Sequence, residues 1–244
     1  MKGDAKPRGV EAESRALFSR VGFEPTGTDE SFLDRLYEAV LEGNRTMNLT
    51  RITGRAEFDR KHVLDSLLPF LAVPELRTLP GTLTAADLGS GAGFPGLVLA
   101  RFHPGWRLVL IERTQKKARF LEETARRLDL ENVSVAAVDA REARTKHPAL
   151  ESGCELVVAR AVGRVEAVSK AAAPLLGMGG RLVHYKGGSP DPEELRQGRL
   201  AAPKLGLEQA EPVPYQLPPD AERSVVISTR RSSGRKRSVA FRRT

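Results

Sequence analysis

The chain of 244 residues is long enough to bury a substantial core, and its 40% apolar and 29% charged residues are typical of a soluble globular protein. Its net charge of +8 favours a polyanionic partner. No apolar run approaches the ~18 residues of a membrane span, and the N-terminus lacks the apolar core of a secretory signal. The single cysteine excludes an intramolecular disulfide and a thiolate zinc site. We therefore expect a cytoplasmic protein without a metal.

Apolar residues recur at helical spacing over the first 75 residues. Residues 12–21 predict a short first helix. The second helix is expected to begin with Thr28 as its N-cap and to end at Gly43-Asn44. A third apolar stripe covers residues 58–71 and is closed by a proline. These residues predict a helical N-terminal extension.

Strand-like and helical runs alternate from Leu83 onward, which predicts an α/β fold with a seven-stranded, mostly parallel sheet and helices on both faces. Ligands of such sheets bind at the carboxyl ends of the strands. The expected strands are 83–88, 106–112, 133–138, 155–160, 180–186, 224–229 and one within 207–216, and the expected helices are 95–102, 114–128, 165–176 and 191–198. We therefore divide the chain into N-terminal helices (1–75), a sheet domain (76–229) and a tail (230–244).

The tail carries the excess charge. Residues 230–244 hold seven basic and no acidic residues, and without these seven of the 39 basic residues the chain has 32 against 31 acidic ones. Such a cluster favours contact with RNA, and the alternative is a disordered, solvated tail with no specific role.

A glycine-rich loop follows the first expected strand. The segment Asp87-Leu88-Gly89-Ser90-Gly91-Ala92-Gly93-Phe94-Pro95-Gly96 has four glycines within eight residues and precedes an apolar run that predicts a helix. Glycine permits positive φ and the close approach of a ligand, and the start of a helix offers free N–H groups. We therefore expect a nucleotide-type ligand at this loop.

Two classes of nucleotide fit this loop. Gly91-x-Gly93-x-x-Gly96 matches the dinucleotide pattern, with Glu112 at roughly the ~20-residue distance of a ribose-binding acid. Gly89-x-Gly91-x-Gly93 behind Asp87 matches methyltransferases that use S-adenosylmethionine, whose positive end an acid can satisfy. In that case Glu112 takes the ribose hydroxyls and Asp139-Ala140 covers the adenine. The alternatives are that Asp139 is a plain turn residue and that Glu112 pairs with Arg113 or Lys116.

The sequence around the loop resembles the glucose-inhibited division protein B family, bacterial methyltransferases that act on N7 of one guanine in small-subunit (16S) ribosomal RNA. The matching passages occur in order from about residue 30 to 229, and they are MNLTRIT (47–53), KHVLDSL (61–67), DLGSGAGFPG (87–96), VVARAVGRVEAV (157–168), HYKGG (184–188) and ERSVVI (222–227). Two departures are the Asp139-Ala140-Arg141 turn, where members often have Arg-Ala-Glu, and a tail without the Tyr-Pro-Arg-Arg-x-Gly pattern.

The resemblance implies a Rossmann-like methyltransferase fold, S-adenosyl-L-methionine as the cofactor, and small-subunit ribosomal RNA or the assembling small subunit as the partner; we expect a monomer. Together, the loop and the resemblance predict cofactor contacts at Asp87, Gly89, Gly91, Gly93, Phe94, Glu112, Asp139, Ala140, Arg141 and Arg160. RNA contacts are expected at Lys61, Arg164, Lys186 and Arg223, with Arg51, Arg55 and the tail as further contacts to the RNA backbone.

Methylation of guanine N7 requires no general base, because N7 has a free lone pair and loses no proton. Alignment and exclusion of water then provide catalysis. Arg160, at a strand end, is the expected catalytic residue because a guanidinium can fork onto base acceptors or phosphate; the alternative is an ion pair with Glu112 or Glu155. His62 and Asp65 are expected to form a structural hydrogen bond with each other.

Other functions stay open at this point. A methyltransferase of another RNA, a dinucleotide-binding oxidoreductase and a non-catalytic RNA-binding factor are compatible with the loop. The turn Arg160-Ala161-Val162-Gly163 disfavours adenine amino methylation, which usually uses an Asn-Pro-Pro-Tyr turn, and Cys154 is expected to be a core residue rather than a nucleophile. Tyr185 is a candidate for stacking on an RNA base, with ordinary strand packing as the alternative.

Overall fold

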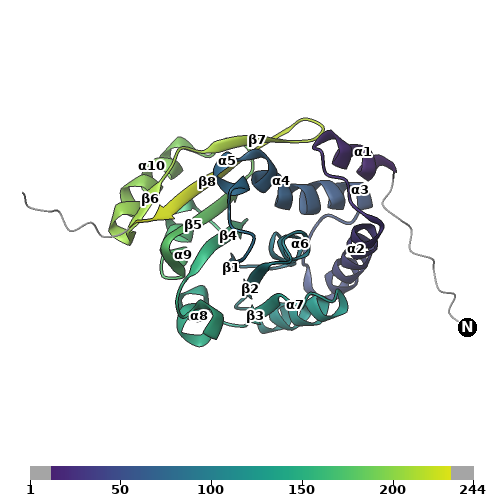
Figure 1. The fold of residues 1–244 in the computed structure, drawn as a ribbon, viewed down its shortest axis with the longest axis horizontal. Helices are drawn as coiled ribbons and strands as arrows, with labels where there is room; N and C mark the ends of the chain where they lie inside the picture. Colours follow the sequence, from purple (N-terminus) through teal and green to yellow (C-terminus); the bar gives the residue numbers. More distant parts are fainter. Residues whose placement is uncertain (1–11, 232–244) are drawn as a thin grey trace, which may run out of the picture.

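The computed structural model describes residues 12–231, so the expected tail lies almost entirely outside the described residues. Within this range one sheet has the strand order β3-β2-β1-β4-β5-β8-β6, and β7 also pairs with β8 (Figure 1). The strands are β1 Leu83–Leu88, β2 Trp106–Ile111, β3 Val133–Ala136, β4 Cys154–Arg160, β5 Leu176–Lys186, β6 Leu207–Gln209, β7 Val213–Leu217 and β8 Ala221–Arg230.

Helices precede the sheet and connect its strands. Those of the N-terminal extension are α1 Ala12–Arg20, α2 Gly27–Met47, α3 Arg55–Phe58, the π-helical turn η1 Asp59–Leu64, α4 Asp65–Ala72 and α5 Pro74–Arg77. Those of the sheet domain are α6 Gly96–Phe102, α7 Gln115–Arg127, α8 Ala140–Lys146, η2 Pro148–Leu150, α9 Val165–Ala172, α10 Pro192–Ala201 and η3 Ala202–Leu205. In this described part of the chain no helix is both long and apolar enough to cross a membrane.

The strands pair as the alternating pattern predicts. Neighbouring strands from β3 to β5 are parallel, and β8 returns antiparallel to β5. β7 pairs with Ala221–Val225 of β8, and β6 pairs with Ser228–Arg230 of β8. The predicted mostly parallel sheet is therefore confirmed, but it has eight strands rather than seven, because two short strands, β6 and β7, pair with β8 where one was expected.

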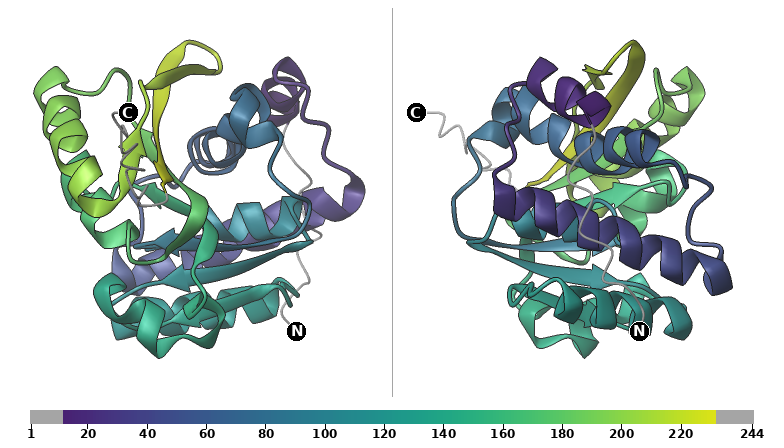
Figure 2. Two further views of the ribbon diagram at one scale, coloured as in Figure 1. Left: turned by 60° about the vertical axis from the view of Figure 1, so that its left-hand side comes forward. Right: turned by 90° about the vertical axis from the view of Figure 1, so that its right-hand side faces the viewer.

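Side chains alternate between two cores on opposite faces of the sheet, as the two-residue period of a strand requires. Leu108 and Leu110 of β2 pack on the face that α1, α2, α4, α6 and α7 cover. Val109 and Ile111 pack on the face of α8 and α9. Figure 2 shows these two helical layers with the sheet between them. The N-terminal extension therefore shares the first core and is not a separate body.

Helix α2 differs from the sequence prediction at both ends. Its N-cap is Thr26 rather than Thr28, because Thr26 forms a capping box with Asp29. It does not end at Gly43-Asn44 but continues to Met47, and Asn48 ends it in a left-handed conformation. A Cβ on Gly43 would lie 2.6 Å from Phe120 Cε2 of α7. The glycine is therefore explained by the close packing of two helices and not by a helix end.

Four further elements differ from the sequence prediction. α9 ends at Ala172 rather than at 176, because Leu176 already pairs with Cys154 as the start of β5. The turn after β3 opens the unpredicted helix α8, for which Asp139 is the N-cap. The third apolar stripe of the extension is interrupted by the π-turn η1. Strand β8 continues to Arg230, one residue beyond the predicted boundary.

Arg55 does not face solvent as an RNA contact should. Its side chain is 9% exposed and lies between Asp34 of α2 and Asp59 of η1, with 2.7 Å from Nε to Asp59 Oδ2. Burial raises the pKa of Asp59 despite this neighbour. The ion cluster of Arg55, Asp34 and Asp59 therefore holds the helices of the extension together.

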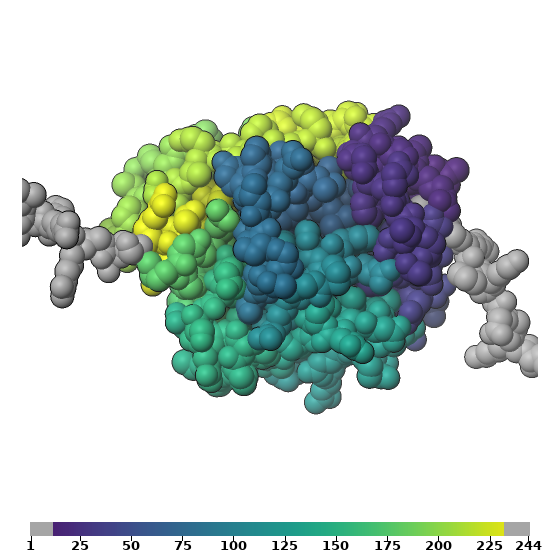
Figure 3. Space-filling model, in the orientation of Figure 1, coloured from purple at the N-terminus to yellow at the C-terminus, as the bar shows by residue number. Residues whose placement is uncertain are grey.

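The extension also contacts the last strands. Figure 3 shows the N-terminal helices against the β7–β8 hairpin on one face, where Arg60 donates to the Pro218 carbonyl.

We predict that Arg55→Ala lowers the free energy of unfolding by about 3–5 kcal/mol, because it leaves two buried carboxylates without a cation. Arg35→Ala is the matched control, since Arg35 pairs with Asp129 at the surface, where the side chains are 46% and 77% exposed. That control should lose less than about 1 kcal/mol. Urea unfolding measures both, and equal losses would contradict the assignment of Arg55 to a buried cluster.

Candidate functional site

The glycine loop joins β1 to α6 beside β4, where the order of the strands reverses. Gly89, Gly91 and Gly93 have φ values of +70°, +55° and +96°. These values lie in the left-handed region that favours glycine. A Cβ on Gly89 would lie 3.1 Å from Val162 Cγ1 in the turn after β4. The loop therefore has the exposed-backbone geometry that its sequence predicts.

The buried carboxylate of Asp87 accepts a hydrogen bond from the first amide of α6. Asp87 is 1% exposed, and its Oδ2 accepts the Gly96 amide at 3.0 Å. Burial raises the pKa of Asp87 to about 6. The amides of Gly89 and Ser90 both donate to the Ile111 carbonyl, at 2.9 and 3.1 Å. The expected free N–H group at the start of α6 is therefore already bound at Gly96, and an internal anion stands where a dinucleotide would place its pyrophosphate.

A cavity of about 400 Å³, the loop cavity, lies at the carboxyl ends of the strands. It brings together five of the residues expected to bind a cofactor, from the ends of β1, β2 and β3. Its lining consists of Leu88, Gly89, Ile111, Glu112, Arg113, Val138, Asp139, Ala140, Arg141, Val162 and Ala171. Val162 belongs to the turn after β4 that the sequence singled out, whereas Val138 was not expected at the site, because an apolar residue after a strand carries no distinctive signal.

Glu112 is fixed by backbone amides rather than by cations. Its Oε2 accepts the Gly91 amide at 3.1 Å and its Oε1 accepts the Thr114 amide at 2.8 Å. In the described part of the chain Glu112 forms no ion pair with Arg113 or Lys116, and Lys116 instead donates to the Thr46 carbonyl. Each carboxylate oxygen keeps a second lone pair. Glu112 can therefore accept hydroxyl groups from a ligand in the loop cavity.

Asp139 and Arg141 form the opposite rim of the loop cavity. Asp139 Oδ1 accepts the Arg141 amide at 3.0 Å as the cap of α8, and the Arg141 side chain donates to the same carboxylate. Hydrogen bonds from Arg141 lower the pKa of Asp139 to about 2. Asp139 thus orders the rim in addition to facing the cavity.

Phe94 lies on the far side of the loop from this cavity. It is 5% exposed, and its ring stacks on His62 with 4.4 Å between centroids and 6° between planes. Phe58 meets the Phe94 ring edge-on at 5.5 Å. Phe94 therefore attaches the loop to the N-terminal extension.

A second cavity of about 310 Å³, the cationic cavity, adjoins the ends of β4, β5 and β8. It brings together the three basic residues that the sequence singled out at these strands. Its lining consists of Asp65, Arg160, Ala161, Gly163, His184, Tyr185, Lys186, Gly187 and Arg223. Ala161 has φ +58°, which is uncommon outside glycine and points to a functional constraint. The turn 161–163 separates the two cavities, since Val162 lines one and its neighbours line the other.

The N-terminal extension holds the guanidinium of Arg160. Nη1 lies 3.2 Å from the Lys61 carbonyl, 3.4 Å from Asp65 Oδ2 and 3.4 Å from Ser66 Oγ, and Nη2 lies 3.4 Å from His62 Nδ1. These partners come from η1 and the start of α4. The alternative, an ion pair of Arg160 with Glu112 or Glu155, is therefore not found, since its carboxylate partner is Asp65 of the extension.

Asp65 also joins the extension to the last strands. Its Oδ1 accepts the Tyr215 hydroxyl of β7 at 2.9 Å and lies 3.6 Å from Nε of Arg223 on β8. The predicted bond between His62 and Asp65 is wrong, since His62 Nε2 lies 3.0 Å from Thr50 Oγ1. The segment KHVLDSL (61–67) resembles the family in the sequence, but the partners of His62 and Asp65 could not be deduced from it.

Other residues near the cationic cavity are mostly paired. Lys186 Nζ lies 2.8 Å from Glu194 Oε1. Burial raises the pKa of Glu194, but hydrogen bonds from Lys186 and from the Val165 amide outweigh it and leave this pKa below its ordinary value. Tyr185 is buried and donates to the Ser66 carbonyl at 2.8 Å, so its predicted stacking on RNA is wrong. Lys61 and Arg164 lie outside both cavity linings and pair with Glu57 and Asp191.

Nucleophilic and metal chemistry find no support in this region. Burial raises the pKa of Cys154 to about 12, and its thiol is a buried core group on β4, as the sequence predicts. Among residues 12–231 no group of three or more His, Cys, Asp or Glu side chains is placed to hold a metal.

The chain is similar to one family over most of its length. Residues 29–214 match the GidB model, described as rRNA small subunit methyltransferase G. A protein of that name from Gloeobacter violaceus is 37% identical over 206 residues, covering 84% of this chain and 80% of the relative. One from Carboxydothermus hydrogenoformans is 36% identical over 219 residues, covering 89% and 90%.

Among solved structures, the fold resembles a 16S rRNA (adenine(1408)-N(1))-methyltransferase from Catenulisporales acidiphilia. The TM-score is 0.51 at 15% identity, and the match covers 62% of this chain and 86% of that one. This likeness shows the fold alone, and it agrees with the Rossmann-like methyltransferase fold that the sequence predicts.

We predict that His62 stays neutral from pH 8 down to about pH 4, because burial, followed by Arg160 and Lys61, lowers its pKa to about 3. Since Arg160 can only donate, Nδ1 must accept and Nε2 must carry the proton. NMR of ¹⁵N-histidine measures both the titration and the tautomer. An Arg160→Met variant should move the pKa of His62 upward, and titration of the wild-type ring near 6.5 would contradict the buried arrangement.

Proposed function

Because the chain belongs to the rRNA small subunit methyltransferase G family, we propose that it transfers a methyl group from S-adenosylmethionine to N7 of a guanine in small-subunit ribosomal RNA. One observation supports this assignment above the others. Two cavities meet at the turn 161–163, one with a carboxylate suited to a ribose and one lined by three cations. That arrangement suits a nucleoside cofactor on one side and an anionic polynucleotide on the other.

The loop cavity fits S-adenosylmethionine, which supplies the methyl group. Gly89 and Gly91 leave the backbone bare toward the methionine part, and Glu112 accepts the ribose hydroxyls. The rim Asp139-Ala140-Arg141 lies along the adenine. Asp87 stays beneath the loop and provides a negative charge under the positive end of the cofactor. Gly93 and Phe94 shape the loop from below, so their contribution to cofactor affinity is indirect.

The cationic cavity is suited to the target nucleotide. The major-groove edge of guanine presents O6 and N7 as acceptors. N7 must keep its lone pair for the methyl group, so Arg160 donates to O6 or to a phosphate. Lys186 and Arg223 hold the RNA backbone, and Lys61, Arg164 and the basic tail add weaker contacts. Arg160 is the residue that we assign to the reaction itself.

This reaction removes no proton from N7, so it requires no general base, and neither His62 nor Cys154 is placed to act as one. His62 is committed to Arg160 and Thr50, and Cys154 keeps its proton. The chain then contributes alignment of N7 with the methyl carbon and exclusion of water by the turn 161–163. A dinucleotide-dependent oxidoreductase is disfavoured by the Asp87 carboxylate at the start of α6.

The direct test incubates the purified chain with S-adenosylmethionine and unmodified small subunits or their RNA, and maps the methylated nucleotide. Gly91→Asp should abolish transfer and cofactor binding, because it places a carboxylate beside Glu112 in a left-handed position. Gly22→Asp is the matched control, since Gly22 has φ +69° with no neighbouring atom within 4 Å of its Cβ position. Binding of a nicotinamide dinucleotide without the sulfonium cofactor would refute the proposal.

Asp65 acts as a positioning residue for Arg160, and Asp65→Asn should lower kcat by about 10- to 100-fold, because loss of its charge frees the guanidinium from its site. Cofactor affinity measured by calorimetry should not change. Tyr215→Phe removes another contact of the same carboxylate and keeps its charge, so it should leave kcat within about threefold. A kcat of Asp65→Asn equal to that of Tyr215→Phe would show a merely structural role.

A further inference from the structure

An exposed apolar side chain stands where the two cavities meet. Val162 lines the loop cavity, whereas its neighbours Ala161 and Gly163 line the cationic cavity. The other large apolar side chains that are exposed among residues 12–231 line neither cavity, and they are Leu71, Met178 and Leu200. Val162 is 39% exposed, so it leaves apolar surface available to a ligand at the site.

The backbone of the turn after β4 holds this side chain in place. Ala161 has φ +58° and Gly163 has φ +145°. A positive φ costs an alanine free energy, and it persists only where the surrounding structure determines it. Arg160, directly before the turn, is anchored to the Lys61 carbonyl and to Asp65. The turn therefore has a fixed position between the two cavities.

The glycine loop supports Val162 from the side of the cofactor. A Cβ on Gly89 would lie 3.1 Å from Val162 Cγ1 and 3.4 Å from Val162 Cγ2, so both methyl groups lie over this glycine. A β-branched side chain of this kind is stiff at χ1. In the proposed function the methionine part of the cofactor runs along Gly89 and Gly91. The two methyl groups of Val162 therefore lie beside the cofactor, next to the cavity that Arg160 lines.

Aromatic rings beside the site are closed to a base. Stacking on a purine requires a ring with an exposed face. Tyr185 and His184 line the cationic cavity but are only 4% and 1% exposed. Phe94 is 5% exposed and already stacks on His62. Among the described residues that line the two cavities, Val162 is thus the one exposed large apolar side chain.

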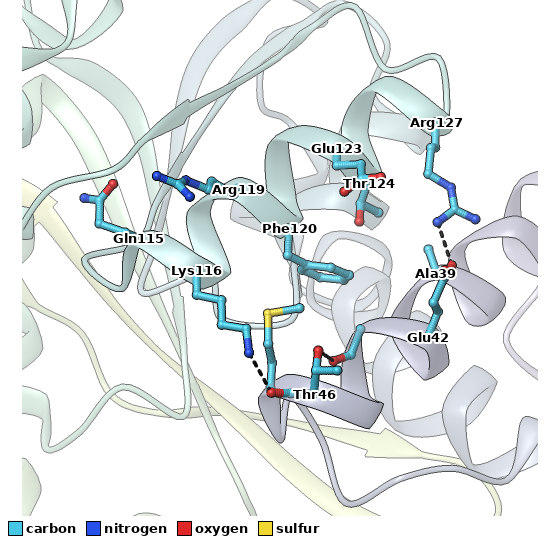
Figure 4. Close-up of a pocket in the computed structure, with 12 residues that line it drawn as sticks. Ala39, Glu42, Thr46, Gln115, Lys116, Arg119, Phe120, Glu123, Thr124 and Arg127 are labelled. Atoms are coloured by element: carbon cyan, nitrogen blue, oxygen red, sulfur yellow. Dashed lines mark hydrogen bonds and ion pairs between the residues drawn. The ribbon is translucent and has the colours of Figure 1, made fainter.

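The groove between α2 and α7 provides no such face either (Figure 4). It has a volume of about 600 Å³, and the single aromatic residue of its described lining, Phe120, is 9% exposed. Figure 4 shows bridges across this groove, from Lys116 to the Thr46 carbonyl at 2.9 Å and from Arg127 to Glu42 at 2.8 Å. The groove also lies outside both cavities, so it does not compete with Val162 for the target base.

We propose that Val162 is the surface on which the flat face of the target guanine packs, and that it thereby fixes N7 in front of the methyl group of the cofactor. This inference rests on the proposed function and deepens it, since Arg160 holds the polar edge of the base and Val162 holds its face. A purine held in this way keeps the lone pair of N7 free. The two methyl groups also exclude water from the reacting atoms, because they offer it no hydrogen bond.

The test replaces Val162 in the whole chain and measures methyl transfer to unmodified small subunits or their RNA. Val162→Ala removes both methyl groups and should lower kcat by about tenfold, because the base is then less well aligned. Val162→Ile keeps a branched apolar side chain and should retain kcat close to the wild-type value. Leu71→Ala is the matched control, since Leu71 is 44% exposed and lines neither cavity, and its kcat should equal that of the wild type.

Calorimetry with S-adenosylmethionine in the absence of RNA separates this role from a contact with the cofactor alone. Val162→Ala should bind the cofactor with close to wild-type affinity. Weaker cofactor binding together with a wild-type kcat at saturating cofactor assigns Val162 to the cofactor alone and overturns the proposal. A kcat of Val162→Ala equal to that of Leu71→Ala also overturns it, provided that the wild-type chain methylates RNA. Absence of methylation by the wild type overturns the proposed function instead.

Discussion

The arrangement of the site depends on the guanidinium of Arg160, whose side chain is only 14% exposed. A charge this far from water must be hydrogen-bonded and paired. The sheet that carries Arg160 supplies none of the four partners described above, and the N-terminal extension supplies them all. The π-turn η1 presents a carbonyl and a neutral histidine, and the start of α4 presents Asp65. In the proposed function the extension is therefore part of the reaction centre, because its packing on the first core determines where Arg160 points.

Asp87 imposes the second constraint, because it determines what kind of nucleotide the glycine loop can hold. Its carboxylate accepts the Gly96 amide at the helix start, where an anionic ligand would otherwise bind. With a pKa of about 6, it is negative near neutral pH. In the proposed function this charge disfavours a phosphate at the loop and favours a ligand with a positive centre. Charge therefore divides the site, since Glu112 lines the loop cavity, with Asp87 buried beneath the loop, and Arg160 lines the cavity beside it.

The same edge of the sheet extends this division of charge outward. Lys186 of β5 and Arg223 of β8 line the cationic cavity on one side of the glycine loop, and in the proposed function they hold the RNA there. Affinity would then come from surface phosphates, while the reaction depends on a few buried groups.

The sequence by itself determined the fold class, the glycine loop and the family, and it singled out several of the residues that line the two cavities. These follow from local patterns: alternating strands and helices, glycines at left-handed positions, and polar residues placed just after strands. Tertiary structure decided the partners. The pairing of Arg160 with Asp65, the burial of Arg55 and Tyr185, and the role of Gly43 in helix packing all join segments far apart in the chain. Local spacing carries no information about such contacts, because they exist only once the extension has packed against the sheet.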